Sequence, residues 1–244
     1  MIFTGYCGNR SNVENGLYKT EFQIAGGTGR GMLYVRDGKM LGGNSAFAFV
    51  GTYAVDGDTI SIDISTVRHN DDPNFKPLFG VDIITLKLTG HPTATGYAFE
   101  GGAVQIPGVV FRSVMTRVDN DDAVEDTADK GIRRGLYSMH VKMLDGVTGG
   151  NTGVLVLDRG RIRGGDAFFY YVGSYTSADG RWKGSLINYE HAPAHREHPL
   201  FGGHEVGIGF SGSYNDSAAD TDATALVGKR SVRFHAVLKF IADI

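Results

Sequence analysis

Apolar and polar side chains alternate along most of this chain with a period of two residues, rather than with the 3.6-residue period of a helix. In segment 58–66, Ile60, Ile62 and Ile64 fall on one face, and the polar residues between them fall on the other. The same alternation is found in 17–24, 84–88 and 232–240. One buried face and one solvated face are typical of antiparallel strands, so the pattern predicts an all-β protein.

The chain contains two copies of one sequence unit. Residues 31–53 read GMLYVRDGKMLGGNSAFAFVGTY, and residues 153–175 read GVLVLDRGRIRGGDAFFYYVGSY. The same spacing between the copies continues without a gap to the PLFG sequences at 77–80 and 199–202. The unit has the length of a domain, so the sequence predicts a tandem duplication.

Glycine-containing dipeptides separate the apolar runs and predict tight turns. Asp37-Gly38 in the first copy and Arg159-Gly160 in the second lie between two short strands, where glycine supplies a positive φ. These turns divide each copy into about eight strands. In the first copy they are predicted at 16–25, 29–36, 38–42, 45–54, 58–66, 81–90, 94–100 and 108–118. Without a strong helical segment, each sheet must close on itself or pair with a second sheet, and we predict two tandem eight-stranded antiparallel barrels.

Four segments follow from this organisation: an N-terminal arm at 1–15, a first barrel repeat at 16–118, an acidic linker at 119–134 and a second barrel repeat at 135–244. The linker begins DNDDAVEDTADKG and has no periodicity, which indicates a solvated segment, with an acidic docking tail as the alternative. The sequence NDSAADTDAT at 215–224 is predicted to be a second acidic loop.

Composition narrows the possible partners and the cellular compartment. The net charge is −3, and the basic residues are scattered, so we expect no binding to nucleic acid. The single cysteine, Cys7, cannot form an intramolecular disulfide and is read as incidental. No apolar run has the length of a membrane span, and no targeting sequence is recognised, so a cytoplasmic protein without a membrane association is expected.

Histidines give the strongest candidate chemistry. His191, His195, His198 and His204 lie among glutamates within 190–205, and this density could bind a metal. The first copy retains only His69, opposite His191, so a unit that needed a metal would be expected to carry more ligands in both copies. His69 and His191 could also act as general bases, but no nucleophile motif accompanies them, and a structural role is favoured.

Glycine-rich segments do not form a nucleotide site in this sequence. AGGTGRG at 25–31 and TGGNTG at 148–153 are followed by strands, and neither has the Lys-Ser/Thr pair of a phosphate-binding loop. We therefore predict no catalytic residue, no cofactor and no required metal, and a protein that is not an enzyme. The shared pairs Gly42-Gly43 and Gly164-Gly165 are instead expected at unusual backbone angles or where another segment approaches closely.

The repeated segment resembles the GrlR family of small negative regulators of bacterial type III secretion. The resemblance rests on Gly135-Leu136-Tyr137, Gly153-Val154-Leu155, the run from Gly160 to Asp166, and Tyr171-x-Gly173. It implies a lipocalin-like eight-stranded barrel in each copy, with an apolar cavity. It also implies a non-catalytic regulator that binds and sequesters a protein partner, a transcriptional activator. The first copy departs from the motif at Asn44 and Phe49.

Three functional hypotheses remain open at this stage: a regulator acting by protein–protein interaction, a carrier or sensor of an apolar small molecule or lipid, and an enzyme at the histidine-rich segment. The inward-facing residues predicted to line a ligand cavity are Phe22, Ile24, Phe47, Ile60, Ile62 and Phe169. The residues predicted to bind a partner are Asp56, Asp58, Asp179, Phe168 and Tyr170. Phe168 and Tyr170 are also candidates for the contact between the two copies.

Overall fold

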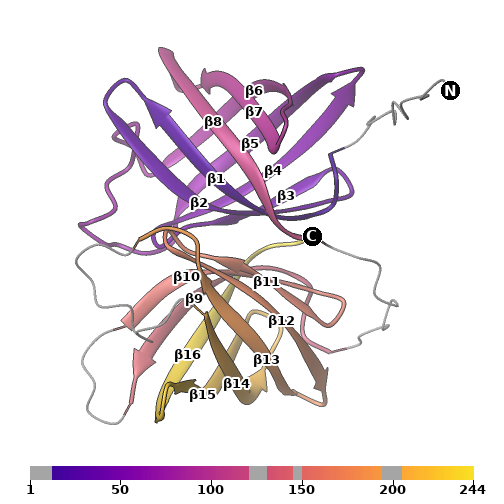
Figure 1. Ribbon diagram of the computed structural model, residues 1–244, viewed down its shortest axis with the longest axis vertical. Helices are drawn as coiled ribbons and strands as arrows, with labels where there is room; N and C mark the ends of the chain where they lie inside the picture. Colours follow the sequence, from indigo (N-terminus) through magenta and orange to yellow (C-terminus); the bar gives the residue numbers. More distant parts are fainter. Residues whose placement is uncertain (1–12, 121–130, 145–149, 194–204) are drawn as a thin grey trace, which may run out of the picture.

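The computed structural model describes residues 13–120, 131–144, 150–193 and 205–244, and it consists of two closed antiparallel barrels stacked on each other (Figure 1). The first barrel contains β1 (Gly16–Ile24), β2 (Gly27–Arg36), β3 (Lys39–Gly43), β4 (Phe47–Asp56), β5 (Thr59–Arg68), β6 (Ile83–Pro92), β7 (Gly96–Ala103) and β8 (Ile106–Asn120). The second contains β9 (Gly135–Met143), β10 (Gly150–Asp158), β11 (Arg161–Gly165), β12 (Phe169–Ala178), β13 (Arg181–Glu190), β14 (Glu205–Tyr214), β15 (Ala218–Val227) and β16 (Arg230–Ala242). The predicted tandem eight-stranded barrels are confirmed.

Each barrel is a meander in which consecutive strands are neighbours. Closure comes from pairing of the first and last strands, β1 with β8 and β9 with β16. The predicted turns are present: φ is 48° at Asp37 and 86° at Gly38, and it is 49° at Arg159 and 76° at Gly160. Positive φ at both central residues matches the twist of the flanking strands, which explains why these dipeptides connect β2 to β3 and β10 to β11.

The prediction of a loop at 215–224 is wrong, because β15 covers most of that segment. Ala219, Thr221 and Ala223 point into the barrel and are buried, while the residues between them face solvent. The small inward residues do not form an apolar pattern that can be recognised in the sequence. The acidic residues of the outer face therefore dominate the pattern of this segment. Most of the predicted arm, with Cys7, and most of the acidic linker lie outside the described residues.

Shared glycines allow adjacent strands to approach closely. A Cβ on Gly42 would lie 2.0 Å from the carbonyl oxygen of Met32, and one on Gly164 would lie 2.2 Å from that of Val154. Real Cβ atoms do not reach such distances from backbone, so β3 and β11 need glycine at these positions. The expectation of a close approach at both pairs is confirmed.

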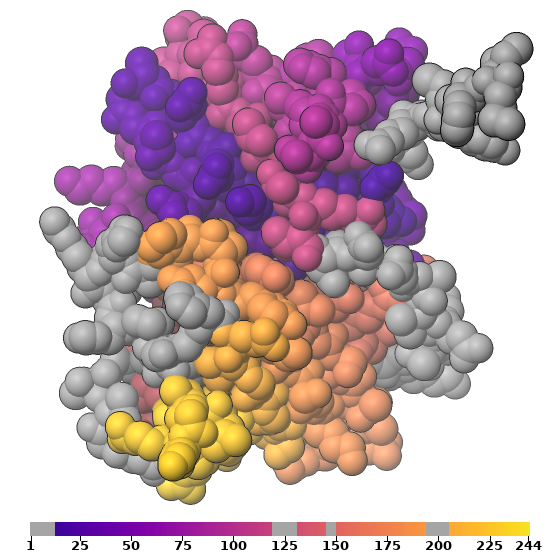
Figure 2. All heavy atoms as spheres, in the orientation of Figure 1, coloured from indigo at the N-terminus to yellow at the C-terminus, as the bar shows by residue number. Residues whose placement is uncertain are grey.

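The two barrels pack on each other through equivalent strands. β2 contacts β11, and β3 contacts β10, which is the exchange expected of a two-fold-related contact. Figure 2 shows the two copies as one continuous body. The contact is filled by buried side chains of both copies, namely Leu17, Met32, Tyr34, Leu41, Ala48, Leu136, Val154 and Val156. The two copies therefore pack with pseudo-two-fold symmetry, but the centre of the contact is mainly aliphatic, and Tyr170, predicted for this contact, packs at its margin.

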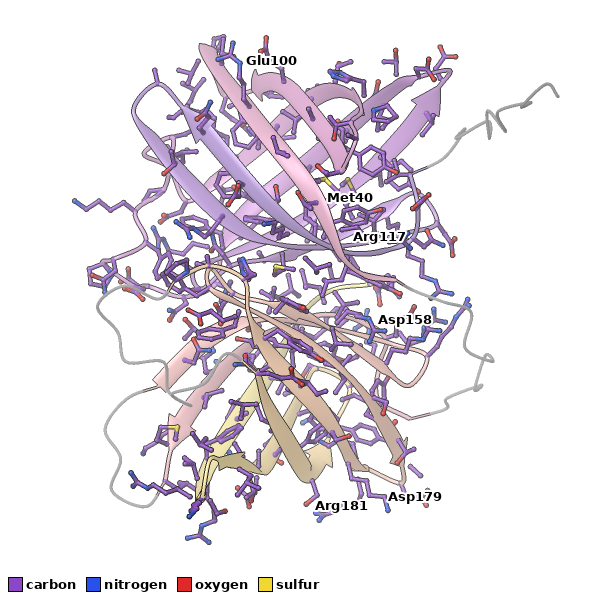
Figure 3. All side chains as sticks on the ribbon, viewed as in Figure 1. Met40, Glu100, Arg117, Asp158, Asp179 and Arg181 are labelled. Atoms are coloured by element: carbon purple, nitrogen blue, oxygen red, sulfur yellow. The ribbon has the colours of Figure 1, made fainter. Side chains whose placement is uncertain are left out.

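A charged pair lies between the barrels at equivalent positions. Arg36 ends β2, Asp158 ends β10, and Arg36 Nη1 lies 3.3 Å from Asp158 Oδ2. Arg134 Nη2 lies 2.7 Å from the other carboxylate oxygen. The Asp158 side chain is 2% exposed, and its position between the two barrels is visible in Figure 3. The duplication has therefore placed opposite charges where identical copies would place like charges.

Candidate functional site

The interior of the first barrel is hollow. It contains a cavity of about 640 Å³, a volume typical of small-molecule sites. Apolar side chains from the strands form most of its wall: Phe22, Leu33, Met40, Phe47, Phe49, Ile62, Ile64, Ile84, Leu86, Leu88, Phe99, Phe111 and Met115. The alternation seen in the sequence explains this wall, because every second residue of a barrel strand points inward.

Aromatic rings organise one side of the cavity. The Phe22 ring stacks on Phe111 with centroids 5.7 Å apart and meets Phe49 edge-on at 5.9 Å. Phe79, from the segment between β5 and β6, stacks on the other side of Phe111 at 6.2 Å. Offset and edge-to-face pairs of this kind fix ring positions, so the cavity has a defined aromatic wall.

The end of the barrel where β1 begins is closed. Val13 is buried there, and Tyr53 donates a hydrogen bond from its hydroxyl to the Val13 carbonyl at 3.3 Å. Tyr18 donates to the carbonyl of Glu14 at 2.7 Å, and the hydroxyl of Tyr97 accepts from the Glu14 amide at 3.2 Å. Burial raises the pKa of Tyr18, so it remains a neutral donor.

The opposite end forms the mouth, and both copies contribute to it. The first copy supplies the turn after β1 and the segment 74–79, and the second supplies Ala167 and Phe168. The Phe168 ring lies 6.3 Å from the Phe75 ring, and the Arg30 guanidinium carbon lies 5.9 Å from the Phe168 ring. The cavity of one barrel is thus bordered by a side chain of the other.

Among the residues that the structure describes, the interior of the second barrel is almost filled. The described residues leave a cavity of about 40 Å³, and Trp182, which is 3% exposed, occupies the interior. The Trp182 ring centroid lies 4.6 Å from that of Phe210 and 6.3 Å from that of Tyr175. The buried Asn188 Nδ2 has no hydrogen-bond partner among the described residues, and Asn188 lines this cavity, which has room for a water molecule.

The shared histidines hold equivalent turns in the two copies. Nε2 of His69 donates to the carbonyl of Asn44 at 3.0 Å, and Nε2 of His191 donates to that of Asp166 at 3.3 Å. The Asn44 and Asp166 side chains in turn accept backbone N–H bonds from the start of the following strand. Burial lowers the pKa of both histidines, so they are held neutral. This geometry supports the structural role.

The carboxylate of Asp166 has further neighbours that Asn44 lacks. It accepts from Asn151 Nδ2 at 3.0 Å and from the hydroxyl of Tyr171. Burial, followed by the charge of Asp166, raises the pKa of Tyr171, so this hydroxyl is a neutral donor to a charged acceptor. The substitution of Asn44 by Asp166 between the copies is therefore matched by Phe49 becoming Tyr171.

Metal ligands do not converge within the part of the chain that the structure describes, where no three His, Cys, Asp or Glu side chains form a cluster. His195, His198 and His204 lie outside the described residues. Within the same part, no helix combines the length and apolar character needed to cross a membrane.

The predicted cavity residues fall into three groups. Phe22, Phe47 and Ile62 line the cavity of the first barrel. Ile24 and Ile60 pack on the same core but are not part of the cavity wall. Phe169 belongs to the core of the second barrel.

The predicted partner-binding residues do not form one surface. Asp56 and Asp58 are exposed around the β4–β5 turn, and Asp179 is exposed at the end of the second barrel far from the first (Figure 3). Phe168 borders the cavity mouth, and Tyr170 packs at the margin of the contact between the copies, with its ring 4.9 Å from that of Tyr189.

Sequence reasoning missed the mouth of the cavity. Arg30 lies in the glycine-rich segment 25–31, which gave no sign of a ligand site, and Lys76 lies in a segment without periodicity. One signal was available: the copies differ at Ala46 and Phe168, and an aromatic on the strand face opposite the inward residues indicates a contact. That the contact would border a cavity of the other copy depends on three-dimensional packing.

No family model and no curated protein matches this chain. Among solved structures, the chain is similar to a crystal structure from Bacteroides fragilis NCTC 9343 described as a "putative outer membrane protein", with 10% sequence identity and a TM-score of 0.26. The alignment covers 93% of this chain and 97% of that one. A likeness at this TM-score carries no argument about function.

Proposed function

We propose that this protein is a non-catalytic binding protein whose first barrel holds an apolar small molecule. The observation that carries the proposal is the cavity of about 640 Å³, which is lined by apolar side chains and open at one end. Burial of an apolar ligand in such a space is favourable by roughly 25 cal/mol per Å² of apolar surface removed from water. The wall residues Ile62 and Leu88 lie directly opposite each other on β5 and β6, so the space is held by paired strands.

Binding of a neutral apolar dye such as Nile red tests this proposal. We expect micromolar binding with an increase in fluorescence, and Ile62→Trp should weaken binding at least tenfold because the larger ring occupies the cavity. Ser61→Trp is the matched control, since Ser61 is the exposed neighbour on the outer face of the same strand. Equal binding by wild type and both variants, or no binding at all, would contradict the proposal.

A second candidate function is regulation by binding a protein partner, as the GrlR resemblance implies. The observation that favours it is an exposed apolar group on the outer face of the first barrel. Val67 and Ile83 pair across β5 and β6 and are 37% and 64% exposed, and Val104 in the β7–β8 turn is 56% exposed. Exposed apolar side chains that lie together are typical of protein interaction sites.

A reporter for type III secretion gene expression separates this candidate from ligand binding. If the protein sequesters an activator, its expression should lower the reporter signal, and Ile83→Glu should restore it. Glu100→Gln, at another exposed position of the same barrel, should not. An unchanged reporter signal with the wild-type protein would exclude this regulatory function in the tested system.

A further inference from the structure

The mouth of the first-barrel cavity carries positive charge that its wall does not balance. The charged residues bordering the cavity are Arg30, after the β1–β2 turn, and Lys76, in the segment before β6. No aspartate or glutamate is among the described residues that border it. The mouth is therefore cationic, while the interior behind it is apolar.

Two carboxylates near the mouth, Asp82 and Asp72, are engaged elsewhere. Asp82 forms an ion pair with Arg68, with Nε and Oδ1 2.6 Å apart. Asp72 accepts a hydrogen bond from the amide of Asn74 at 2.8 Å and so holds its own turn. Glu21 lies opposite Arg30 in the β1–β2 pairing, on the outer face of the barrel, but among the described residues neither Glu21 nor another carboxylate forms an ion pair with Arg30 or Lys76. The two cations thus keep their capacity to bind an external anion.

Arg30 is positioned by the second copy. Its guanidinium lies 5.9 Å from the centroid of the Phe168 ring, within the range of a cation–π contact. The Phe168 ring also lies 6.3 Å from that of Phe75, one residue before Lys76. The equivalent of Phe168 in the first copy is Ala46, which offers no ring. The duplication therefore supplies an aromatic side chain to only one of the two barrel mouths.

We propose that the ligand of the first barrel is a single-chain amphiphile with an anionic carboxylate head. This inference rests on the proposed ligand-binding function and adds the chemical class of the ligand. The acyl chain lies in the apolar interior, against the stacked rings of Phe22 and Phe111, and the carboxylate lies at the mouth between Arg30 and Lys76. Phe168 of the second copy acts as a positioning residue for Arg30.

Calorimetric titration with three ligands of equal chain length tests the head group: dodecanoate, 1-dodecanol and dodecyltrimethylammonium, each below its micelle concentration. We expect dodecanoate to bind most tightly and the cationic ligand to bind most weakly. Arg30→Gln/Lys76→Gln should weaken dodecanoate by about tenfold and leave dodecanol unchanged, because only the ion pairs are lost. Arg112→Gln is the matched control, since Arg112 lies on the outer face of β8 and pairs with Glu100.

Phe168→Ala tests the role of the second copy. It should weaken dodecanoate more than dodecanol, whereas Phe168→Tyr, which keeps the ring, should restore the preference. Equal affinities for dodecanoate and dodecanol in the wild type, or a tenfold preference that survives Arg30→Gln/Lys76→Gln, would overturn the carboxylate assignment and leave the apolar cavity as a binding site. Absence of binding by all three ligands would instead overturn the proposed function itself.

Discussion

The two barrels pair their strands in the same register but differ in the side chains that point inward. At the position where the first barrel has Ile60, the second has Trp182, and the hairpin pairing is the same, with Val55 opposite Ile60 and Ser177 opposite Trp182. Further along the same strand, the large Ile62 is replaced by Gly184.

The space left by Gly184 is taken by a ring from the next strand. A Cβ on Gly184 would lie 2.8 Å from Cζ of Phe210, which stands where the first barrel has Leu88. Trp182 packs on the same ring, and its Nε1 donates to the carbonyl of Asp220 at 2.9 Å. A barrel of fixed strand number therefore becomes hollow or filled according to the size of its inward side chains.

Trp182→Ala should give the largest effect, because it opens space inside the second barrel, which is filled in the wild type. The substitution removes a buried ring and leaves a cavity, so we expect a loss of about 3–5 kcal/mol in the free energy of unfolding, measured by urea denaturation. Trp182→Phe should retain most of the stability. Ile60→Ala, at the equivalent position of the first barrel, should cost less. A loss below about 1 kcal/mol for Trp182→Ala would show that the ring does not support the second barrel.

Asp158→Ala tests the charge difference between the copies. It leaves Arg36 and Arg134 without their shared carboxylate between the barrels, so we expect a loss of about 3 kcal/mol in the free energy of unfolding. Glu205→Ala removes an exposed carboxylate of the same copy and should change stability by less than about 0.5 kcal/mol. If the two variants unfold at the same denaturant concentration, the pair does not stabilise the contact.

Gly164→Val and Gly42→Val test the close approach of adjacent strands, which both barrels share. Both side chains would collide with backbone of the adjacent strand, so each variant should lose roughly 1–3 kcal/mol in the free energy of unfolding. Gly207→Val is the control, because nothing lies within 4 Å of a Cβ at that position. If the loss in the free energy of unfolding differs widely between Gly164→Val and Gly42→Val, the backbones of the two barrels are less alike than their pairing registers indicate.

Most strands and turns of the two barrels could be predicted from sequence, because they depend on residues that are close together in the chain. A period of two fixes which residues face inward, as Phe47 and Ile62 show, and dipeptides with positive φ, such as Asp37-Gly38, fix the turns. Because the unit is repeated, both copies of the sequence supported these predictions. The strand at 218–227 was missed because its inward residues, such as Ala219 and Ala223, are too small to give an apolar signal.

The cavity could not be predicted in the same way. Whether a barrel is hollow depends on the summed volume of side chains from all its strands, and Trp182 gave no local signal that it would fill the interior. The mouth depends on a segment between β5 and β6 and on Phe168 of the other copy. Such contacts join residues that are far apart in sequence, and no period or spacing encodes them.

Lowering the pH should give the smallest effect and should act on both copies. Burial lowers the pKa of His69, His191 and His140 below the ordinary value of about 6.5. A depressed folded-state pKa means that the unfolded chain binds more protons, so stability is full above about pH 6.5 and falls as the pH decreases through that value toward the lowered folded-state pKa. Urea midpoints measured between about pH 5 and about pH 8 should therefore decrease on the acidic side.

The contact between the copies should contribute most to this pH dependence. The His69 and His140 rings meet edge-to-face with centroids 6.3 Å apart, and Nε2 of His140 lies 3.3 Å from Oδ1 of Asn70. The charges of Arg68 near His69 and of Lys239 near His140 act in the same direction as burial. Replacing His69 and His140 together by asparagine should flatten the profile, whereas His91→Asn, at an exposed position, should not. A profile as steep in the double variant as in the wild type would place the acid sensitivity outside the contact between the barrels.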